Sequence, residues 1–197
     1  MRALVLHAAG DARIEDRPEP RPPRDREVTL RVTRVGLCGT DASEYGAGPV
    51  MTPLKARHPA SGVLGPIVLG HEFIGVVEAV GSSVERVHTG DRVAAGAGVW
   101  CGDCPWCRRG QTNLCASYWT FGLSADGGLT ERITVPEKML HPIAAQVTDD
   151  NAAQCGRQHG RRAETPNAVG DRHPASFGLA RVLEHERALQ VPRAVQA

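Results

Sequence analysis

The sequence at residues 70–81 reads GHEFIGVVEAVG, a Val-rich run between glycines. The apolar, β-branched stretch 74–80 is typical of a short strand, and the flanking glycines are typical of turns. Similar short runs occur at residues 3–7, 28–35, 92–95 and 129–135. Many short strands with frequent turn residues predict a mainly β, barrel-like antiparallel architecture.

The composition limits the class of protein. With 197 residues, 41% hydrophobic and 23% charged, the chain suits one globular domain, or one domain and a tail. Aromatic residues make up 4%, so we expect a core of Val, Leu, Ile and Ala. A formal net charge of +1 gives no reason to expect nucleic acid or an anionic membrane as a partner. No apolar run reaches the roughly 18 residues of a spanning helix, and the N-terminus turns polar too early for a signal peptide. We therefore expect a cytoplasmic protein.

The chain divides into two parts that differ in amino-acid composition. Residues 1–146 contain the predicted strands and form the predicted domain, whereas residues 147–197 form a divergent tail rich in Arg, Pro, Ala and His. Beyond Thr148 there is no Ile, Trp, Tyr or Lys and a single Phe, Phe177. Burial of so few apolar residues cannot offset the conformational entropy lost on ordering the chain. We therefore expect the tail to be largely disordered, with one short helix at 179–189. Its composition also suggests a reading-frame shift in a GC-rich gene, which resequencing would test.

Four clustered cysteines give the sharpest local signal, CGDCPWCRRGQTNLC at residues 101–115. In a cytoplasmic protein, clustered thiols favour metal binding over disulfides. Two residues between successive cysteines let the thiolates of Cys101, Cys104 and Cys107 converge on one ion, and Cys115 completes a tetrahedron. Four sulfur ligands leave no open position, which indicates a structural zinc site. An iron–sulfur cluster is the alternative, but the spacing to the fourth cysteine suits it poorly.

Two further segments carry potential ligands, GLCGTD at residues 36–41 and GHE at residues 70–72. Taken alone, Cys38 after a Val-rich strand is usually a core residue. His71 alone is more often a surface histidine than a ligand. The presence of both in a chain with the four-cysteine lobe favours a second metal site.

Together these motifs resemble the zinc-containing medium-chain alcohol dehydrogenases. The pattern Gly70-His71-Glu72-x-x-Gly75-x5-Gly81 is similar to that family's zinc signature, and GDRV at 90–93 and the four-cysteine lobe follow at the expected intervals. The motifs EY at 44–45, GP at 48–49, HP at 58–59 and GLSADGG at 122–128 are most similar to the 2,3-butanediol, sorbitol and threonine dehydrogenase branch. The resemblance covers about residues 1–146 and implies a GroES-like barrel with a four-cysteine structural zinc lobe.

The resemblance also implies roles for individual residues. Cys38 and His71 would be ligands of a catalytic zinc that polarises the substrate oxygen, as in the three-ligand site established for alcohol dehydrogenases. Thr40 would take the alcohol proton through its hydroxyl group. Asp41 would orient the imidazole from behind the ligands, and Glu72 would tune the site.

The sequence departs from the family in three places. Ser43 stands where the proton relay of many members has a histidine, and serine does not titrate near neutrality. The Glu-Pro segment expected to supply a third zinc ligand after residue 150 is replaced by Gln154-Cys155-Gly156, so Cys155 is the alternative ligand. No Gly-x-Gly-x-x-Gly turn opens a helix, since Gly96-Ala97-Gly98 runs into the cysteine lobe. We therefore expect an absent nicotinamide-binding (Rossmann) domain, no cofactor-binding residues and an incomplete catalytic zinc site.

Three functions compete. The first is the zinc-binding catalytic domain of an NAD(P)-dependent dehydrogenase of small alcohols or polyols, truncated and inactive alone. In that case Zn²⁺ fills the structural site, and NAD(P) binds in complete relatives. The second is a non-catalytic zinc-binding or interaction module. The third, a nucleic-acid-binding zinc ribbon, is disfavoured by the neutral charge and the Cys38 and His71 motifs. The sequence does not predict the substrate, the choice of NAD or NADP, or the oligomeric state.

Overall fold

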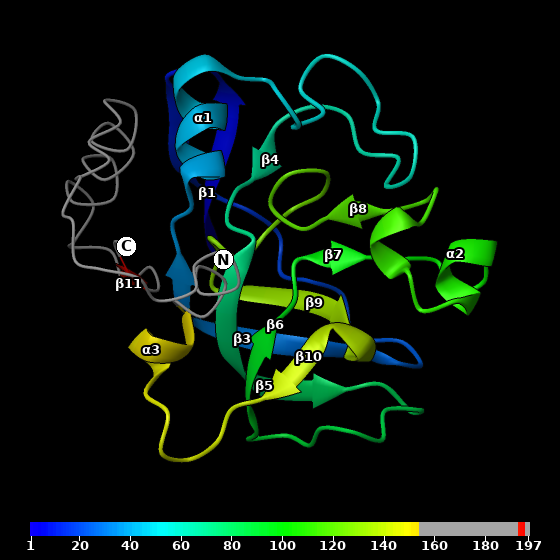
Figure 1. Cartoon of the computed structure of the whole chain (residues 1–197). Helices are drawn as coiled ribbons and strands as arrows, with labels where there is room; N and C mark the ends of the chain where they lie inside the picture. The colour runs from blue at the N-terminus through cyan, green and yellow to red at the C-terminus, as the bar shows by residue number, and fades with distance from the viewer. Residues whose placement is uncertain (154–192, 196–197) are drawn as a thin grey trace, which may run out of the picture.

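The structure, a computed structural model, describes residues 1–153 and 193–195 (Figure 1). It confirms the mainly β, barrel-like architecture predicted from the sequence. Residues 147–153, assigned above to the divergent tail, belong to the described part and include a short helix. The helix predicted at 179–189 lies outside the described residues.

The strands of the described residues form three sheets. The first has the order β2-β1-β4, with β1 Arg2–Ala8, β2 Asp11–Asp16 and β4 Ile67–Val68. The second has the order β10-β6-β5-β3-β11, and β9 also pairs with β3. Its strands are β3 Glu27–Gly36, β5 Glu72–Val80, β6 Arg92–Ala95, β9 Arg132–Pro136, β10 Leu140–Pro142 and β11 Arg193–Val195. The third pairs β7 Gly98–Val99 with β8 Trp119–Thr120 beside the cysteine lobe.

Residues 1–153 contain five helical segments: α1 Gly39–Ala47, α2 Pro105–Arg108, η1 Thr112–Leu114, η2 Glu137–Met139 and α3 Asp149–Ala153. α1 was not predicted, because its sequence GTDASEYGA carries only a weak apolar pattern. In the described parts of the chain, none of these helices combines the length and apolarity needed to cross a membrane.

The five predicted strands all form, and one begins later than expected. Residues 3–7, 28–35, 74–80 and 92–95 lie in β1, β3, β5 and β6. The run 129–135 becomes β9 from Arg132 onward, because the residues before it cross between two sheets. The Leu129 carbonyl accepts a hydrogen bond from the Leu4 N–H of the first sheet (2.8 Å). The Glu131 carbonyl accepts one from the Val32 N–H of the second sheet (3.0 Å). Residues 129–131 thus connect the two sheets, which share one hydrophobic core.

The core is aliphatic, as the scarcity of aromatic residues predicts. Alternate residues of β3 point inward: Val28, Leu30 and Val32 are buried, while Arg31 between them is exposed. Each such buried side chain contributes about 1.5–3 kcal/mol relative to exposure. Two aromatic rings, Phe73 and Phe121, meet edge to face with centroids 6.2 Å apart.

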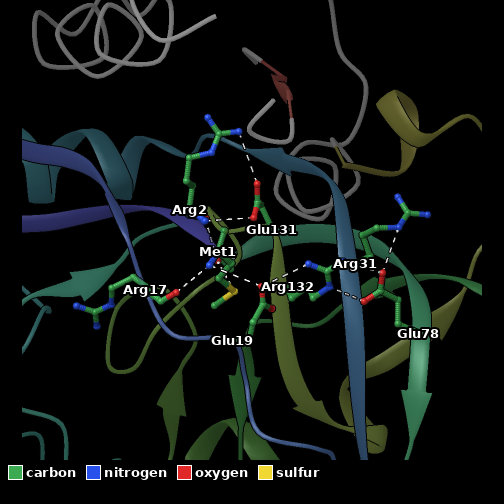
Figure 2. A network of polar contacts seen from close by, with 9 residues as sticks. Met1, Arg2, Arg17, Glu19, Arg31, Glu78, Glu131 and Arg132 are labelled. Atoms are coloured by element: carbon green, nitrogen blue, oxygen red, sulfur yellow. Dashed lines mark hydrogen bonds and ion pairs between the residues drawn. The ribbon is translucent and has the colours of Figure 1, made fainter. Parts of the chain in front are cut away.

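The outward face of the same sheet is charged. Figure 2 shows Arg31 and Arg132, from β3 and β9, both facing Glu78 of β5. Arg132 also reaches Glu19 at 3.6 Å. A sheet with one apolar and one charged face fixes which side packs on the core. The pairing of β3 with β5 shifts register twice, between Thr29 and Leu30 and between Val32 and Arg34, and ends with Gly36 opposite Glu72, next to the site described below.

Candidate metal centres

The four predicted cysteines meet in the lobe formed by residues 101–115. Their sulfur atoms all lie within 4.8 Å of one another. The Cys104–Cys107 and Cys101–Cys115 sulfur separations are both 3.5 Å, and Cys101–Cys107 is 3.9 Å. A zinc–sulfur bond of about 2.3 Å gives a tetrahedron with edges of about 3.8 Å. The sulfur positions therefore fit one tetrahedral zinc ion.

The surroundings of the sulfurs also suit a cation. The backbone N–H groups of Asp103 and Cys104 point at the Cys101 sulfur (3.4 and 3.3 Å) and lower the pKa of Cys101 to about 6. Burial raises the pKa of Cys107 to about 12. Because four neighbouring thiolates repel one another, full ionisation needs a positive ion among them.

The lobe has little hydrophobic support of its own. Residues 102–114 are all exposed or half-buried, and Trp106 and Leu114 are 40% and 48% exposed. Cys115 is the buried member of the ligand set. At its base the lobe is anchored by Lys138, whose ammonium lies 4.9 Å from the Trp100 ring. A lobe without a core needs a metal to hold it together.

A second donor group forms where β3 ends and β5 begins. The Cys38 sulfur, a ring nitrogen of His71 and a carboxylate oxygen of Glu72 lie within 4.8 Å of one another. The antiparallel register places Gly36 of β3 opposite Glu72 of β5, and Cys38 follows two residues later. The sequence placed Glu72 behind the ligands, but the structure brings its carboxylate into the donor group itself.

Asp41 ties together the two segments that carry these donors. Its side chain is fully buried, and its Oδ2 accepts the Cys38 N–H at 2.9 Å. Its Oδ1 accepts the Gly70 N–H at 3.3 Å and lies 3.5 Å from His71 Nδ1. That last contact is electrostatic, since the buried Nδ1 has no hydrogen-bond partner within residues 1–153. Asp41 thus lies where it can orient the imidazole, as the family resemblance implies.

The charges of the group favour metal binding. Burial lowers the pKa of His71, but the Asp41 carboxylate and the Cys38 sulfur outweigh burial and raise it to about 10. The neighbouring His71 lowers the pKa of the Cys38 thiol, against the effect of burial. A thiolate, an imidazole and a carboxylate form a donor set suited to zinc, which binds by displacing the proton.

A glycine before His71 lets the supporting loop approach closely. Gly70 has φ +89°, and a Cβ on it would lie 2.9 Å from side-chain atoms of both Leu129 and Val35. The loop at residues 122–128 packs against this backbone, and the Gly128 N–H donates to the Gly70 carbonyl at 2.7 Å. The GLSADGG motif therefore supports the segment that carries His71.

The remaining predicted residues lie around the donor group. The Thr40 hydroxyl oxygen lies 3.7 Å from the Cys38 sulfur. Ser43 is exposed, and its hydroxyl donates to the Gly39 carbonyl at 3.0 Å, so its proton is directed at the backbone of α1. Cys155, the alternative third ligand, lies outside the described residues.

A buried carboxylate in α1 was not singled out by the sequence. Glu44 of α1 is 1% exposed and accepts the N–H groups of Val50 (3.1 Å) and Met51 (2.6 Å) and the hydroxyl of Thr52 (2.7 Å). It holds the loop that follows α1. The sequence marked Glu44 only as part of the EY motif at 44–45. Burial of Glu44 was not expected, because glutamate is usually exposed to solvent.

Comparisons with known proteins agree with this geometry. Residues 24–145 match the family described as "Alcohol dehydrogenase GroES-like domain". The (R,R)-butanediol dehydrogenase of Neisseria gonorrhoeae is 34% identical over 195 residues, covering 93% of this chain and 55% of that protein. The sorbitol dehydrogenase of Bacillus subtilis is 34% identical over 154 residues, covering 78% of this chain and 41% of that protein. The chain thus spans about half the length of these curated relatives.

Solved structures give the same result. The crystal structure of 2R,3R-butanediol dehydrogenase from Bacillus subtilis superposes with a TM-score of 0.71 at 31% identity, covering 78% of this chain and 43% of that structure. Since the family match alone covers more than half of the sequence, the fold, the cysteine lobe and the sequence motifs all lead to one assignment. The chain belongs to the family of the alcohol dehydrogenase GroES-like domain.

Proposed function

We propose that this chain supplies the zinc-binding part of an NAD(P)-dependent oxidoreductase that acts on the CH–OH group of a small alcohol or polyol. Family membership supports the reaction class, and the names of the butanediol and sorbitol dehydrogenases support the substrate class. Two solved relatives are described as bound to NADH or to NADP, which supports a nicotinamide as the hydride acceptor.

The donor group of Cys38, His71 and Glu72 is the observation that carries this proposal. Four protein sulfurs close a zinc site, whereas three protein donors leave one position open to a substrate. Zinc bound there would act as a Lewis acid that polarises a substrate oxygen and makes its proton easier to remove. The four-cysteine set of the lobe is therefore typical of a structural zinc site. The three-donor set of the barrel is typical of a catalytic zinc site.

The chain's own residues would orient the donors and move the proton. Asp41, fully buried between the Cys38 and Gly70 segments, holds the two donor segments at a fixed separation. The Thr40 hydroxyl, next to the Cys38 sulfur, would accept a proton from an alcohol bound at the group while it passes its own proton to solvent water. Ser43 contributes little to a relay, because its hydroxyl is directed at the backbone of its own helix.

We expect nicotinamide to be held outside residues 1–153. The glycine pair Gly96 and Gly98 leads into β7 and the cysteine lobe, whereas a pyrophosphate site needs a glycine turn that opens a helix. Hydride transfer requires the cofactor beside the reacting carbon. The purified chain should therefore bind zinc and show little or no alcohol oxidation by itself.

A second candidate function is a non-catalytic zinc-binding module. The completeness of the four-cysteine lobe favours it, because this site needs no residue outside 101–115. The two functions differ in metal content. A catalytic-type site predicts about two zinc ions per chain, and a structural module about one.

The test combines metal analysis with two matched variants. We expect Cys104→Ser to remove the lobe zinc and His71→Ala to remove the barrel zinc, each leaving the other. NAD-dependent oxidation of butanediol and sorbitol is assayed in parallel. If His71→Ala leaves the zinc content unchanged, the catalytic-type site is wrong. Robust turnover by the unmodified chain would contradict the expectation that it is inactive alone.

A further inference from the structure

The short helix α3 packs beside β3 and β5, the strands next to which the barrel donor group lies (Figure 1). Its last two residues, Ala152 and Ala153, are buried. A Cβ built on Gly36 would lie 2.8 Å from the Ala153 carbonyl oxygen and 3.0 Å from Glu72 Oε2. Both oxygens therefore lie against the same bare α-carbon, and α3 limits the space open to the Glu72 carboxylate.

α3 cannot hold this position by itself. It has five residues, far below the length at which a helix is stable alone. Arg92 of β6 anchors it, since its guanidinium donates to Asp149 Oδ1 (Nε, 3.0 Å) and to the Val147 carbonyl (2.8 Å). Thr33 of β3 donates to the other oxygen of Asp149 at 3.0 Å. Side chains from β6 and β3 thus both hydrogen-bond to Asp149, the first residue of α3.

A second ion pair, Arg34–Asp150, also reaches α3, but it is more exposed to solvent. Arg34 donates to Asp150 at 2.7 Å, but the Asp150 side chain is 62% exposed. The Arg92–Asp149 pair is more enclosed, with side-chain exposures of 33% and 28%. An exposed ion pair contributes little, so the anchor of α3 is Arg92.

We propose that Arg92 is a positioning residue for the donor group of Cys38, His71 and Glu72. Through Asp149 it fixes α3, and α3 confines the Glu72 carboxylate beside the sulfur and the imidazole. This inference rests on the proposed function, because it assumes that the group binds a metal. It also gives the Arg of the GDRV motif at 90–93 a physical role.

The test measures metal affinity in the full chain. Zn²⁺ and Co²⁺ are titrated into the metal-free chain against a competing chelator, and the Co²⁺ absorption spectrum reports the geometry of each site. Outer-sphere substitutions typically weaken metal binding 10–100-fold, so we expect Arg92→Gln to weaken the barrel site about 10-fold and shift its Co²⁺ spectrum. The lobe affinity should not change.

Two variants and one control make the result specific. Asp149→Asn should act in the same direction, and Arg92→Lys should restore part of the affinity. Arg132→Gln is the matched control, since Arg132 also pairs with a carboxylate, Glu78, but on the outer face of the sheet. If Arg92→Gln fails to fold, Thr33→Val removes one hydrogen bond to Asp149 and should give a smaller loss of affinity.

The outcomes separate this inference from the proposed function. A wild-type chain that binds metal only in the lobe would overturn both. A wild-type chain with two occupied sites, together with Arg92→Gln and Asp149→Asn chains of unchanged barrel affinity and spectrum, would overturn the positioning role alone.

Discussion

The lobe and the barrel build their donor groups in opposite ways. In the lobe all four donors come from residues 101–115, on a segment with little core. In the barrel, Cys38 follows the end of β3, His71 precedes β5 and Glu72 begins it, and the buried Asp41 joins the two segments. The lobe therefore depends on its metal for its shape, whereas the barrel holds its donors in place without one.

The largest effect should follow from removing a lobe ligand. Structural zinc contributes on the order of 10 kcal/mol in small zinc domains, so Cys104→Ser should unfold the lobe. The barrel should stay folded because its core lies elsewhere. Limited trypsin digestion analysed by mass spectrometry should show rapid cleavage at Arg108 and Arg109 in the variant and slow cleavage in the zinc-bound wild type.

His71→Ala is the control for this comparison, since it removes a barrel donor and should leave Arg108 and Arg109 protected. Global unfolding of the Cys104→Ser chain would contradict the independence of the two regions. Unchanged protection of the lobe would contradict its dependence on metal.

A smaller but still large effect should follow from Asp41→Ala. The substitution leaves the N–H groups of the half-buried Cys38 and the buried Gly70 without an acceptor, and each such loss costs up to about 1–3 kcal/mol. We expect the free energy of unfolding of the barrel to fall by about 2–6 kcal/mol in urea denaturation. The barrel zinc should also bind 10–100-fold more weakly.

The matched control is Asp103→Ala in the lobe, whose carboxylate is 86% exposed and pairs with Arg108 at the surface. It should change neither the stability of the barrel nor its zinc affinity. If the two aspartate variants behaved alike, the central position of Asp41 in the barrel site would be wrong.

The same contrast explains what the sequence could predict. The lobe site was predictable from spacing alone, because its ligands are neighbours in the chain. Nothing local predicts that Cys38 and His71 meet, since the pairing of β3 with β5 brings them together; family resemblance supplied that step. The inward position of the Glu72 carboxylate was missed because strand alternation does not fix a side chain at a strand end.

Strands were easier to predict than helices for a related reason. The Val-rich runs carry their own signal, and β6 begins and ends at the predicted residues 92–95. α1 and α3 have weak apolar patterns and are held by contacts from other elements, such as those of Arg92 with Asp149 and Val147. A sequence pattern cannot report a helix that depends on distant anchors.

Glu137 offers a pH-dependent test of the barrel. Its side chain is 3% exposed and accepts the N–H of Glu85 at 2.7 Å and a hydrogen bond from Arg26 at 3.1 Å. Burial raises the pKa of Glu137, but the backbone N–H groups of Arg86 and Glu85 and the charge of Arg26 outweigh it and hold the pKa below the usual 4.5. The ionised carboxylate therefore stabilises the fold.

The sign of the pH effect follows from this depressed pKa. The stabilisation is fully present above about pH 4.5 and is lost as the pH falls through the lower pKa of the folded state. Glu137→Gln should cost about 1–3 kcal/mol of unfolding free energy at pH 7 and less at low pH. Urea denaturation at several pH values measures both, and a cost independent of pH would contradict the role of the charge. Zinc content should not change.

The smallest effect should come from the charged outer face of the barrel. Arg132 pairs with Glu78 at 2.7 Å and reaches Glu19 at 3.6 Å (Figure 2). These side chains are 31–56% exposed, and pairs of this kind contribute about 0–1 kcal/mol. We expect Arg132→Gln to lower the free energy of unfolding by less than about 1 kcal/mol in urea denaturation at low salt. At about 1 M salt the difference should nearly vanish, because the screening length falls to about 3 Å.

Either the barrel core or the outer ion pairs keep the barrel donors in register when no metal is bound. If the core and Asp41 hold β3 against β5, the loss of Arg132 should leave the barrel zinc affinity unchanged, since Arg132 lies on the face away from the core. A weaker barrel zinc site in Arg132→Gln would mean that the outer ion pairs set the β3–β5 register. The preorganisation of the site would then be electrostatic and sensitive to salt, and the difference between the barrel and its metal-dependent lobe would shrink as ionic strength rises.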